Sequence, residues 1–142
     1  MKYIVFACLA WNAASALGCD CAPSSLKAAR AEAEVVFRGK IMAIHDGTVS
    51  FRVDRVWKGS VRSTFDMPDF PETSACLGFL PKLLEVGNEL LVFAWRLHRY
   101  PTDNDYFTSI CTRTGLASEV GATIRKLGKG RLPINSPAAD GR

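Results

Sequence analysis

VVFRGKIMAIHDGTVSFRVDRVWK, residues 35–58, decides the fold of this chain. Its first part, residues 35–44, is rich in β-branched and other apolar residues, which is typical of a strand. Asp46-Gly47 follows, the strongest short hairpin signal in a sequence. Residues 49–54 then alternate apolar and polar side chains, as a half-buried strand does. The stretch therefore predicts a β-hairpin, and Arg55, which stands in an apolar slot, predicts a bulge or strand end there.

Further strands are predicted on the C-terminal side of this hairpin. Residues 61–65, 89–95 and 106–111 are expected to be strands, and the second (ELLVFAW), which is strongly apolar, is expected to be the central one. Residues 67–81 contain three prolines and Cys76, which predicts a long loop. The expected core of the barrel consists of alternating residues of two strands: Val49, Phe51, Val53, Leu91 and Phe93.

Two helices flank the strands in the prediction. Residues 24–34 form a short helix capped by Ser24 or Ser25. Near the other end, Ser118 is expected to cap a helix that stops just before Gly128. We therefore predict a mainly β protein, an OB-fold-like five-stranded Greek-key barrel with a short N-terminal helix and a C-terminal helix.

Residues 1–18 read as a secretory signal peptide. Lys2 precedes an apolar run that is too short to span a bilayer, and small residues place the cleavage site directly before Cys19. Residues 19–130 are then one domain, and residues 131–142, which are poor in apolar groups, are predicted to be a disordered tail. We expect a secreted or periplasmic monomer that is not attached to a membrane.

Two alternatives concern the same N-terminal residues. Cleavage after Ala16 would leave Leu17 and Gly18 ahead of the cysteine. Residues 16–19 also faintly resemble a bacterial lipobox, and an acylated Cys19 would tether the protein to a membrane and block its amine.

Four cysteines follow the signal peptide: Cys19, Cys21, Cys76 and Cys111. An even number in an exported chain indicates two disulfides, which allows three pairings. A bridge between the neighbours Cys19 and Cys21 would be strained, which favours two long-range bridges. In the redox alternative, the C-x-C pair is an active dithiol and Cys76 bonds to Cys111.

Several classes of function are not indicated by the sequence. The net charge of +4 is too small and too diffuse to predict nucleic-acid binding. No HExxH, GxSxG, Walker or GxGxxG pattern occurs, and His45 and His98 are expected at the surface. The C-x-C spacing is not that of a zinc knuckle. We therefore predict a protein that is not an enzyme and needs no cofactor.

Six short pieces of the chain, in order, carry a resemblance to a known family. They resemble the inhibitory N-terminal module of the tissue inhibitors of metalloproteinases, which belongs to the netrin-like OB-fold group. The pieces are CDCAP at 19–23, VVFRGK at 35–40, VWKG at 56–59, CLG at 76–78, ELLVFA at 89–94 and TSIC at 108–111.

The resemblance implies the pairing Cys19–Cys76 and Cys21–Cys111. It also implies a zinc metalloprotease as the partner. The α-amine and carbonyl of the mature N-terminal Cys19 would chelate the catalytic zinc of the protease and displace its water. The side chain of Asp20 would enter the specificity pocket beside the zinc, a position where the family favours a small uncharged residue.

The same resemblance implies a protease-binding ridge made of two segments. The ridge consists of Cys19, Asp20, Cys21, Ala22 and Pro23, with Cys76, Leu77 and Gly78 packed alongside. From the residues alone a second function remains open, an extracytoplasmic OB-fold binding module for a glycan, a peptide or a partner protein. In that case the disulfides are purely structural, and no free amine at Cys19 is needed.

Overall fold

The computed structural model describes residues 18–69, 76–96 and 106–134, and the expected signal peptide lies almost wholly outside them. The strands are β1 (Val35–His45), β2 (Thr48–Lys58), β3 (Thr64–Pro68), β4 (Glu89–Arg96), β5 (Tyr106–Phe107) and β6 (Gly115–Leu116). The helices are α1 (Leu26–Glu32), α2 (Gly121–Leu127) and a short 3₁₀ turn, η1 (Pro81–Leu83). None of these helices is long and apolar enough to cross a bilayer.

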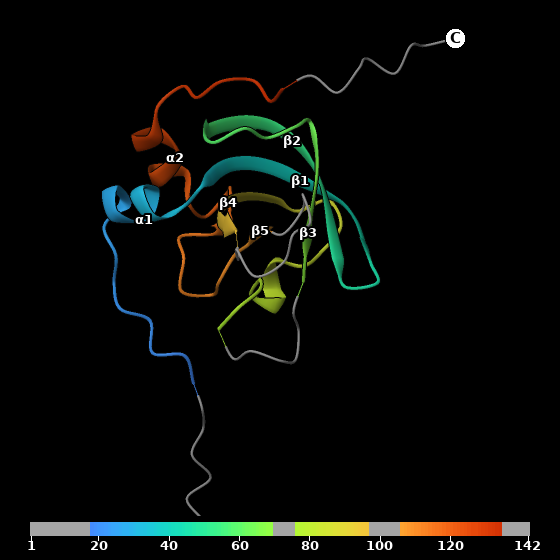
Figure 1. The fold of residues 1–142 in the computed structure, drawn as a ribbon, viewed down its shortest axis with the longest axis horizontal. Helices are drawn as coiled ribbons and strands as arrows, with labels where there is room; N and C mark the ends of the chain where they lie inside the picture. The colour runs from blue at the N-terminus through green and yellow to red at the C-terminus, as the bar shows by residue number, and fades with distance from the viewer. Residues whose placement is uncertain (1–17, 70–75, 97–105, 135–142) are drawn as a thin grey trace, which may run out of the picture.

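The strands form one curled antiparallel sheet (Figure 1). Their order is β3-β2-β1-β4-β5, and β6 pairs separately with β4. The rings of Phe65 in β3 and Tyr106 in β5 lie 5.3 Å apart, although these strands stand at opposite ends of that order. The sheet therefore curls until its ends touch. This confirms the expected fold class, a mainly β protein with one helix near each end of the chain.

The β1–β2 hairpin forms as the sequence predicts. Asp46 and Gly47 both have positive φ, 49° and 69°, which is what a two-residue hairpin turn requires. Farther along, Phe37 pairs with Val56 and Val36 with Lys58, so the register skips Trp57. The predicted irregularity after Val53 is thus confirmed as a pair of register shifts, and β2 continues through them to Lys58.

These shifts matter because both faces of the sheet are buried at this point. One face forms the interior of the half-barrel, where the ring of Phe37 meets Phe51 and Phe65 at 5.5 and 5.3 Å. The opposite face carries Val36 and Trp57, which α1 and α2 cover. The Trp57 Nε1–H donates to the carbonyl of Gly128 just after α2, at 2.8 Å. Consecutive residues of β1 and β2 are therefore buried on opposite sides of the sheet.

The predicted core needs one correction. Val49, Phe51 and Val53 lie in the barrel interior as expected. Leu91 and Phe93 do not, because they face the helices on the outer side. The interior positions of β4 are Leu90, Val92 and Ala94. A strand that is buried on both faces has no polar alternation, so ELLVFAW could not indicate which set points inward.

The element boundaries differ from the expectation in a few places. Ser25 caps α1 as predicted, since its hydroxyl accepts from the N–H of Ala28 at 3.1 Å. The helix α2 ends before Gly128 as expected, but Val120 precedes it and makes no side-chain cap, so the prediction of Ser118 is wrong. The last expected strand, 106–111, shortens to β5, and β6 was not predicted.

Residues 131–134 do not belong to a disordered tail. Arg131 exchanges backbone hydrogen bonds of 2.8 and 2.9 Å with Val56, and the N–H of Ile134 donates to Val61 at 2.9 Å. The carbonyl of Ile134 accepts a hydrogen bond from the N–H of Ser63 at 3.3 Å. The domain therefore extends at least to residue 134, past the predicted boundary. Backbone pairing does not depend on side-chain polarity, so the composition of this segment did not reveal it.

A pair of glycines tests the close approach of β1 and β2. Gly59 has φ +74°, and a Cβ there would lie 2.6 Å from Val35 Cγ1 and still closer to the Glu34 carbonyl. Gly87 has φ +96° and open space around it. Both alanine variants incur the left-handed strain of roughly 1–2 kcal/mol. We expect Gly59→Ala to lower the free energy of unfolding, measured in urea, by about 1–3 kcal/mol more than Gly87→Ala does, because the added methyl group overpacks the site. Equal losses would contradict the close approach.

Two truncations test the pairing of residues 131–134. Removing residues 131–142 deletes four backbone hydrogen bonds to β2 and the segment that follows it. Removing residues 135–142 leaves all four intact. Each bond contributes about 1 kcal/mol net, so the free energy of unfolding of the longer truncation should be a few kcal/mol lower than that of the shorter one. Superimposable thermal unfolding curves would show that residues 131–134 contribute nothing.

Candidate functional site

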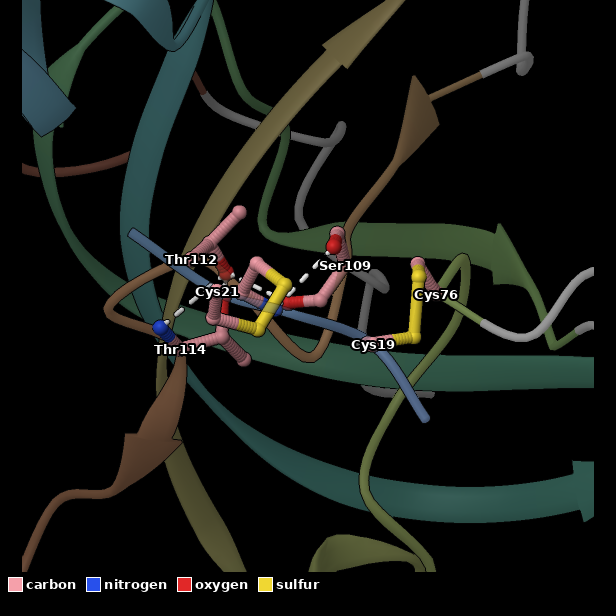
Figure 2. The surroundings of a disulfide bond; sticks show 7 residues. Cys19, Cys21, Cys76, Ser109, Thr112 and Thr114 are labelled. Atoms are coloured by element: carbon pink, nitrogen blue, oxygen red, sulfur yellow. Dashed lines mark hydrogen bonds between the residues drawn. A yellow bond between two sulfur atoms is a disulfide. The ribbon is translucent and has the colours of Figure 1, made fainter. Parts of the chain in front are cut away.

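The N-terminal segment 19–23 is bound to the domain by two disulfides (Figure 2). Cys19 bonds to Cys76 and Cys21 to Cys111, with Cα–Cα distances of 5.6 and 5.0 Å. Both bridges are long-range, and the pairing is the one that the resemblance implies. All four cysteines are bonded, so in this structure the C-x-C pair is not a free dithiol. The bridges fix the segment on both sides of Asp20.

The two anchor points belong to one hydrogen-bonded unit. Leu77 forms an antiparallel bridge with Ser109. The N–H of Gly78 donates to the carbonyl of Thr108 at 2.9 Å, and the N–H of Ile110 donates to that of Cys76 at 3.1 Å. The segments that carry Cys76 and Cys111 therefore cannot move independently, and the N-terminal segment lies across a rigid base.

The end of the segment is also fixed. The guanidinium of Arg113 donates from Nε and Nη2 to the carbonyl of Ser24, at 3.1 and 2.6 Å. Ser25 then caps α1, which packs its buried Ala29 on the outer face of the sheet. Arg113 was not among the predicted site residues, because a basic residue in a loop has no local signal for such a contact.

Exposure divides the predicted ridge into two parts. Asp20, Cys21, Ala22 and Pro23 are exposed, and Cys19 is half-buried. In the neighbouring segment Cys76 and Leu77 are half-buried and Gly78 is buried. The structure thus brings together all eight predicted ridge residues, and the part presented to solvent is 20–23. Gly18 is exposed, and a Cβ added there would meet no atom within 4 Å.

Three threonine hydroxyls, those of Thr108, Thr112 and Thr114, support this base from within, and Figure 2 labels the last two. Thr108, the one buried polar residue among the described positions, donates to the carbonyl of Phe93 at 2.9 Å. Its oxygen also lies 3.1 Å from that of Thr112 and 2.8 Å from that of Thr114. Thr114 accepts from the N–H of Phe93 at 3.0 Å. The network joins the disulfide-bearing loop to β4, and the spacing T-x-x-x-T-x-T was its only signal in the sequence.

A carboxylate closes the base of the loop that carries Cys76. Asp69 accepts a hydrogen bond from the backbone N–H of Phe79, which lowers its pKa. Partial burial has the larger effect and raises the pKa of Asp69 above its ordinary value. The ring of Phe79 packs 5.9 Å from that of Phe51 in the core. The loop therefore begins and ends at one place on the barrel.

A cavity of about 360 Å³ lies beside the ridge. Its walls come from α1, β4 and the Cys111 loop, and they include Ser24, Ala33, Phe93, Trp95 and Thr112. A surface that binds here would meet the exposed ridge and a mostly apolar hollow next to it.

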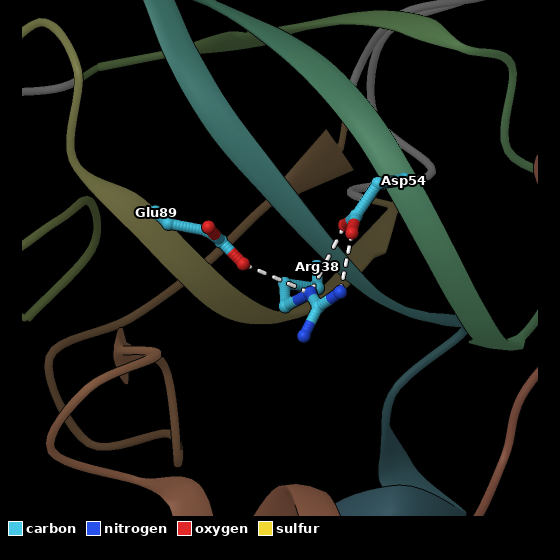
Figure 3. A network of polar contacts seen from close by, with 3 residues as sticks. All are labelled: Arg38, Asp54 and Glu89. Atoms are coloured by element: carbon cyan, nitrogen blue, oxygen red, sulfur yellow. Dashed lines mark hydrogen bonds and ion pairs between the residues drawn. The ribbon is translucent and has the colours of Figure 1, made fainter.

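A second polar surface lies on the outer face of the sheet (Figure 3). The guanidinium of Arg38 in β1 bonds to Asp54 in β2 and lies 3.0 Å from a carboxylate oxygen of Glu89 in β4. The two carboxylates raise the pKa of Arg38, with the hydrogen bond to Asp54 as the main cause. A shallow cavity of about 470 Å³ adjoins Arg38 and Glu89 and is bordered by Asn88 and Ser118. All three charges of this network are mutually satisfied.

The two histidines were expected at the surface. His45 is exposed at the hairpin turn, 3.0 Å from the carboxylate of Asp46, and His98 lies outside the described residues. Among the residues that the structure describes, no group of three or more His, Cys, Asp or Glu side chains could hold a metal ion. No protein-family model matches the chain, and no curated protein matches it either.

The threonine network is testable with an isosteric substitution. Thr108→Val keeps the shape of the side chain but removes the donor to the Phe93 carbonyl, so it should lose about 1–3 kcal/mol in urea unfolding. Thr123→Val is the matched control, because no hydrogen bond of the Thr123 hydroxyl is found in the described structure. An equal, small effect of both substitutions would mean that the network does not stabilise the loop.

Proposed function

We propose that the chain, once cleaved before Cys19, is a secreted inhibitor of zinc metalloproteases that acts through its N-terminus. One observation carries the proposal. The exposed segment 20–23 is joined by disulfides on either side of Asp20 to two loop segments that are themselves hydrogen-bonded together. Two disulfides are typical of proteins that fold in an oxidising, extracytoplasmic compartment.

The chemistry of such a terminus suits a catalytic zinc ion. A catalytic zinc keeps one coordination position open for water or substrate, and a neutral amine can occupy it. The pKa of a free α-amine is ordinarily about 7.7–8, so deprotonation near neutral pH is inexpensive. The carbonyl of Cys19 would be the second ligand, and both atoms belong to the same disulfide-bonded residue.

The rigidity of the ridge supports tight binding. A flexible peptide that fills a protease cleft loses conformational entropy when it binds. Here the disulfides and the contact of Arg113 with Ser24 restrict the segment before any partner arrives. An inhibitor of this kind stays bound without needing a covalent bond to the protease.

Asp20 defines the kind of target. Its carboxylate is exposed and lies next to the amine that would bind zinc. Burying an unpaired carboxylate in an apolar pocket costs several kcal/mol. We therefore propose that the targets are metalloproteases whose pocket beside the zinc carries a basic side chain.

A second candidate function is favoured by the outer-face cavity. An OB-fold-like binding module could hold a glycan, a peptide or a partner protein in the hollow beside Arg38, Asn88, Glu89 and Ser118. Its polar lining supports this alternative. The ion pairs that already satisfy Arg38 leave fewer polar groups for a ligand, so the N-terminal ridge is preferred.

Extension of the N-terminus tests the proposed mechanism. One added alanine before Cys19 displaces the amine by about 3.5 Å, more than a zinc–nitrogen bond of about 2 Å allows. We expect inhibition of any responsive metalloprotease to fall at least 100-fold in a progress-curve assay, without change in melting temperature. N-terminal acetylation of the unextended protein blocks the amine without moving it, and it should reduce inhibition to the same extent. Undiminished inhibition by the extended protein would assign the activity to another surface.

Substitution of Asp20 tests the proposed selectivity. Asp20→Thr removes the charge and should strengthen inhibition of metalloproteases with an apolar specificity pocket by at least tenfold. Asp20→Asn removes the charge but keeps the shape of the side chain, so it should give part of this increase in inhibition. The same variants should inhibit less well where the pocket is basic. If no metalloprotease responds to any of them, the binding module becomes the better account.

A further inference from the structure

Basic side chains from three elements gather on the side of the molecule that α1 and α2 cover. Four of these basic residues, Arg125, Lys126, Lys129 and Arg131, lie within seven positions of one another in the sequence. In the structure the segment after α2 runs beside β2, where Arg131 pairs with Val56 (Figure 1). This pairing brings the basic residues of 125–131 close to basic residues of α1 and β2. The resulting basic strip consists of Arg30, Arg55, Lys58, Arg125, Lys126, Lys129 and Arg131.

Hydrogen bonds place several of these residues beside one another. Arg30 donates to the carbonyl of Trp57 at 3.2 Å. Lys58 donates in return to the carbonyls of Arg30 and Ala31, at 2.7 and 2.9 Å. Arg131 donates to the carbonyl of Gly59. The charges of Arg30, Lys58 and Arg131 are therefore fixed around the end of β2.

A glycine allows the rest of the strip to approach. Gly130 has φ +64°, and a Cβ there would lie 2.9 Å from Trp57 Nε1 and 3.0 Å from Arg55 Cγ. Lys129 and Arg131 flank this glycine, so the chain carries them directly over β2. Lys129 is exposed, as are Arg125 and Lys126 in the last turn of α2.

The strip has no acidic partner among the residues that the structure describes. The ion pairs found there involve Arg38, His45 and Lys82, none of which belongs to the strip. Asp54, next to Arg55, is bound to Arg38 on the adjacent strand. Glu34 accepts from the backbone N–H of Arg96 at 3.1 Å. The positive charge is thus left to solvent or to a ligand.

We propose that this strip binds a sulfated polysaccharide. Charge complementarity requires a polyanion, and the strip extends from α1 across the end of β2 to the segment after α2, which suits a linear one. The two disulfides indicate an extracytoplasmic compartment, where sulfated polysaccharides rather than nucleic acids are met. The site is separate from the N-terminal ridge and does not depend on protease inhibition.

An anionic bilayer is the competing partner. Leu132 and Ile134 are 71% and 54% exposed at the end of the strip, and such side chains can insert between lipids. The helix that carries Arg125 and Lys126, however, packs its apolar face on the sheet through Leu127. No amphipathic helix is therefore left to lie in a membrane here, which favours the polysaccharide.

Heparin is the probe for the test. Lys126 and Lys129 make no hydrogen bond or ion pair with a described residue, so Lys126→Gln/Lys129→Gln should fold normally. The control, Lys40→Gln/Lys82→Gln, removes the same charge elsewhere. We expect the first variant to bind heparin about tenfold more weakly and elute from a heparin column at lower salt. The control should elute like the parent protein. The affinity of the parent protein should fall linearly with salt on logarithmic axes, as for other linear polyanions.

Three outcomes would overturn the proposal. The parent protein could fail to bind heparin at physiological salt. Both variants could weaken binding equally, which would reflect net charge alone. The protein could bind phosphatidylserine vesicles and not heparin, which would assign the strip to a membrane. Metalloprotease inhibition by the Lys126→Gln/Lys129→Gln variant should equal that of the parent, so failure of this proposal is distinguishable from failure of the inhibitory one.

Discussion

The structure depends on β1 being hydrogen-bonded along both edges and buried on both faces. Over residues 36–40 it pairs with β2 on one side and with β4 on the other. Phe37 fills the half-barrel, and Val36 supports the helices. Burial on this scale stabilises by roughly 1.5–3 kcal/mol for each large apolar side chain, so the two layers are secured by one strand. The disulfides, the helices and the C-terminal segment all attach to this arrangement.

The N-terminal ridge is rigid because its support is continuous with that core. Cys76 and Cys111 sit on paired segments, and the threonine network ties the second of these to Phe93. Phe93 in turn packs beneath α1 and α2. A force on Asp20 is thus transmitted through disulfides and buried hydrogen bonds to the centre of the sheet. This is the mechanical property that a substrate-like inhibitory segment needs, since it must stay in one conformation in a protease cleft.

The two proposed surfaces use different physics. At the ridge, specificity depends on placing a few atoms within bonding distance of a metal ion. On the basic strip, attraction comes from several charges that need no precise partner. A protein with both could be held near a polyanionic matrix while its N-terminus stays available. The glycines after α2 make the strip possible, because they let the chain turn and cross Trp57 closely.

The short-range features of the fold could be predicted from the sequence. Asp46-Gly47 specified the hairpin, Ser25 capped α1, and the misplaced Arg55 marked the irregular register, because each signal acts over a few residues. The cysteine count predicted two disulfides, and a resemblance supplied their pairing. Tertiary packing was needed to establish which face Leu91 and Phe93 occupy, that residues 131–134 pair with the barrel, and that Arg30 and Arg131 both bond at the end of β2. These outcomes depend on how the sheet curls and on backbone groups that all residues share, and local sequence encodes neither.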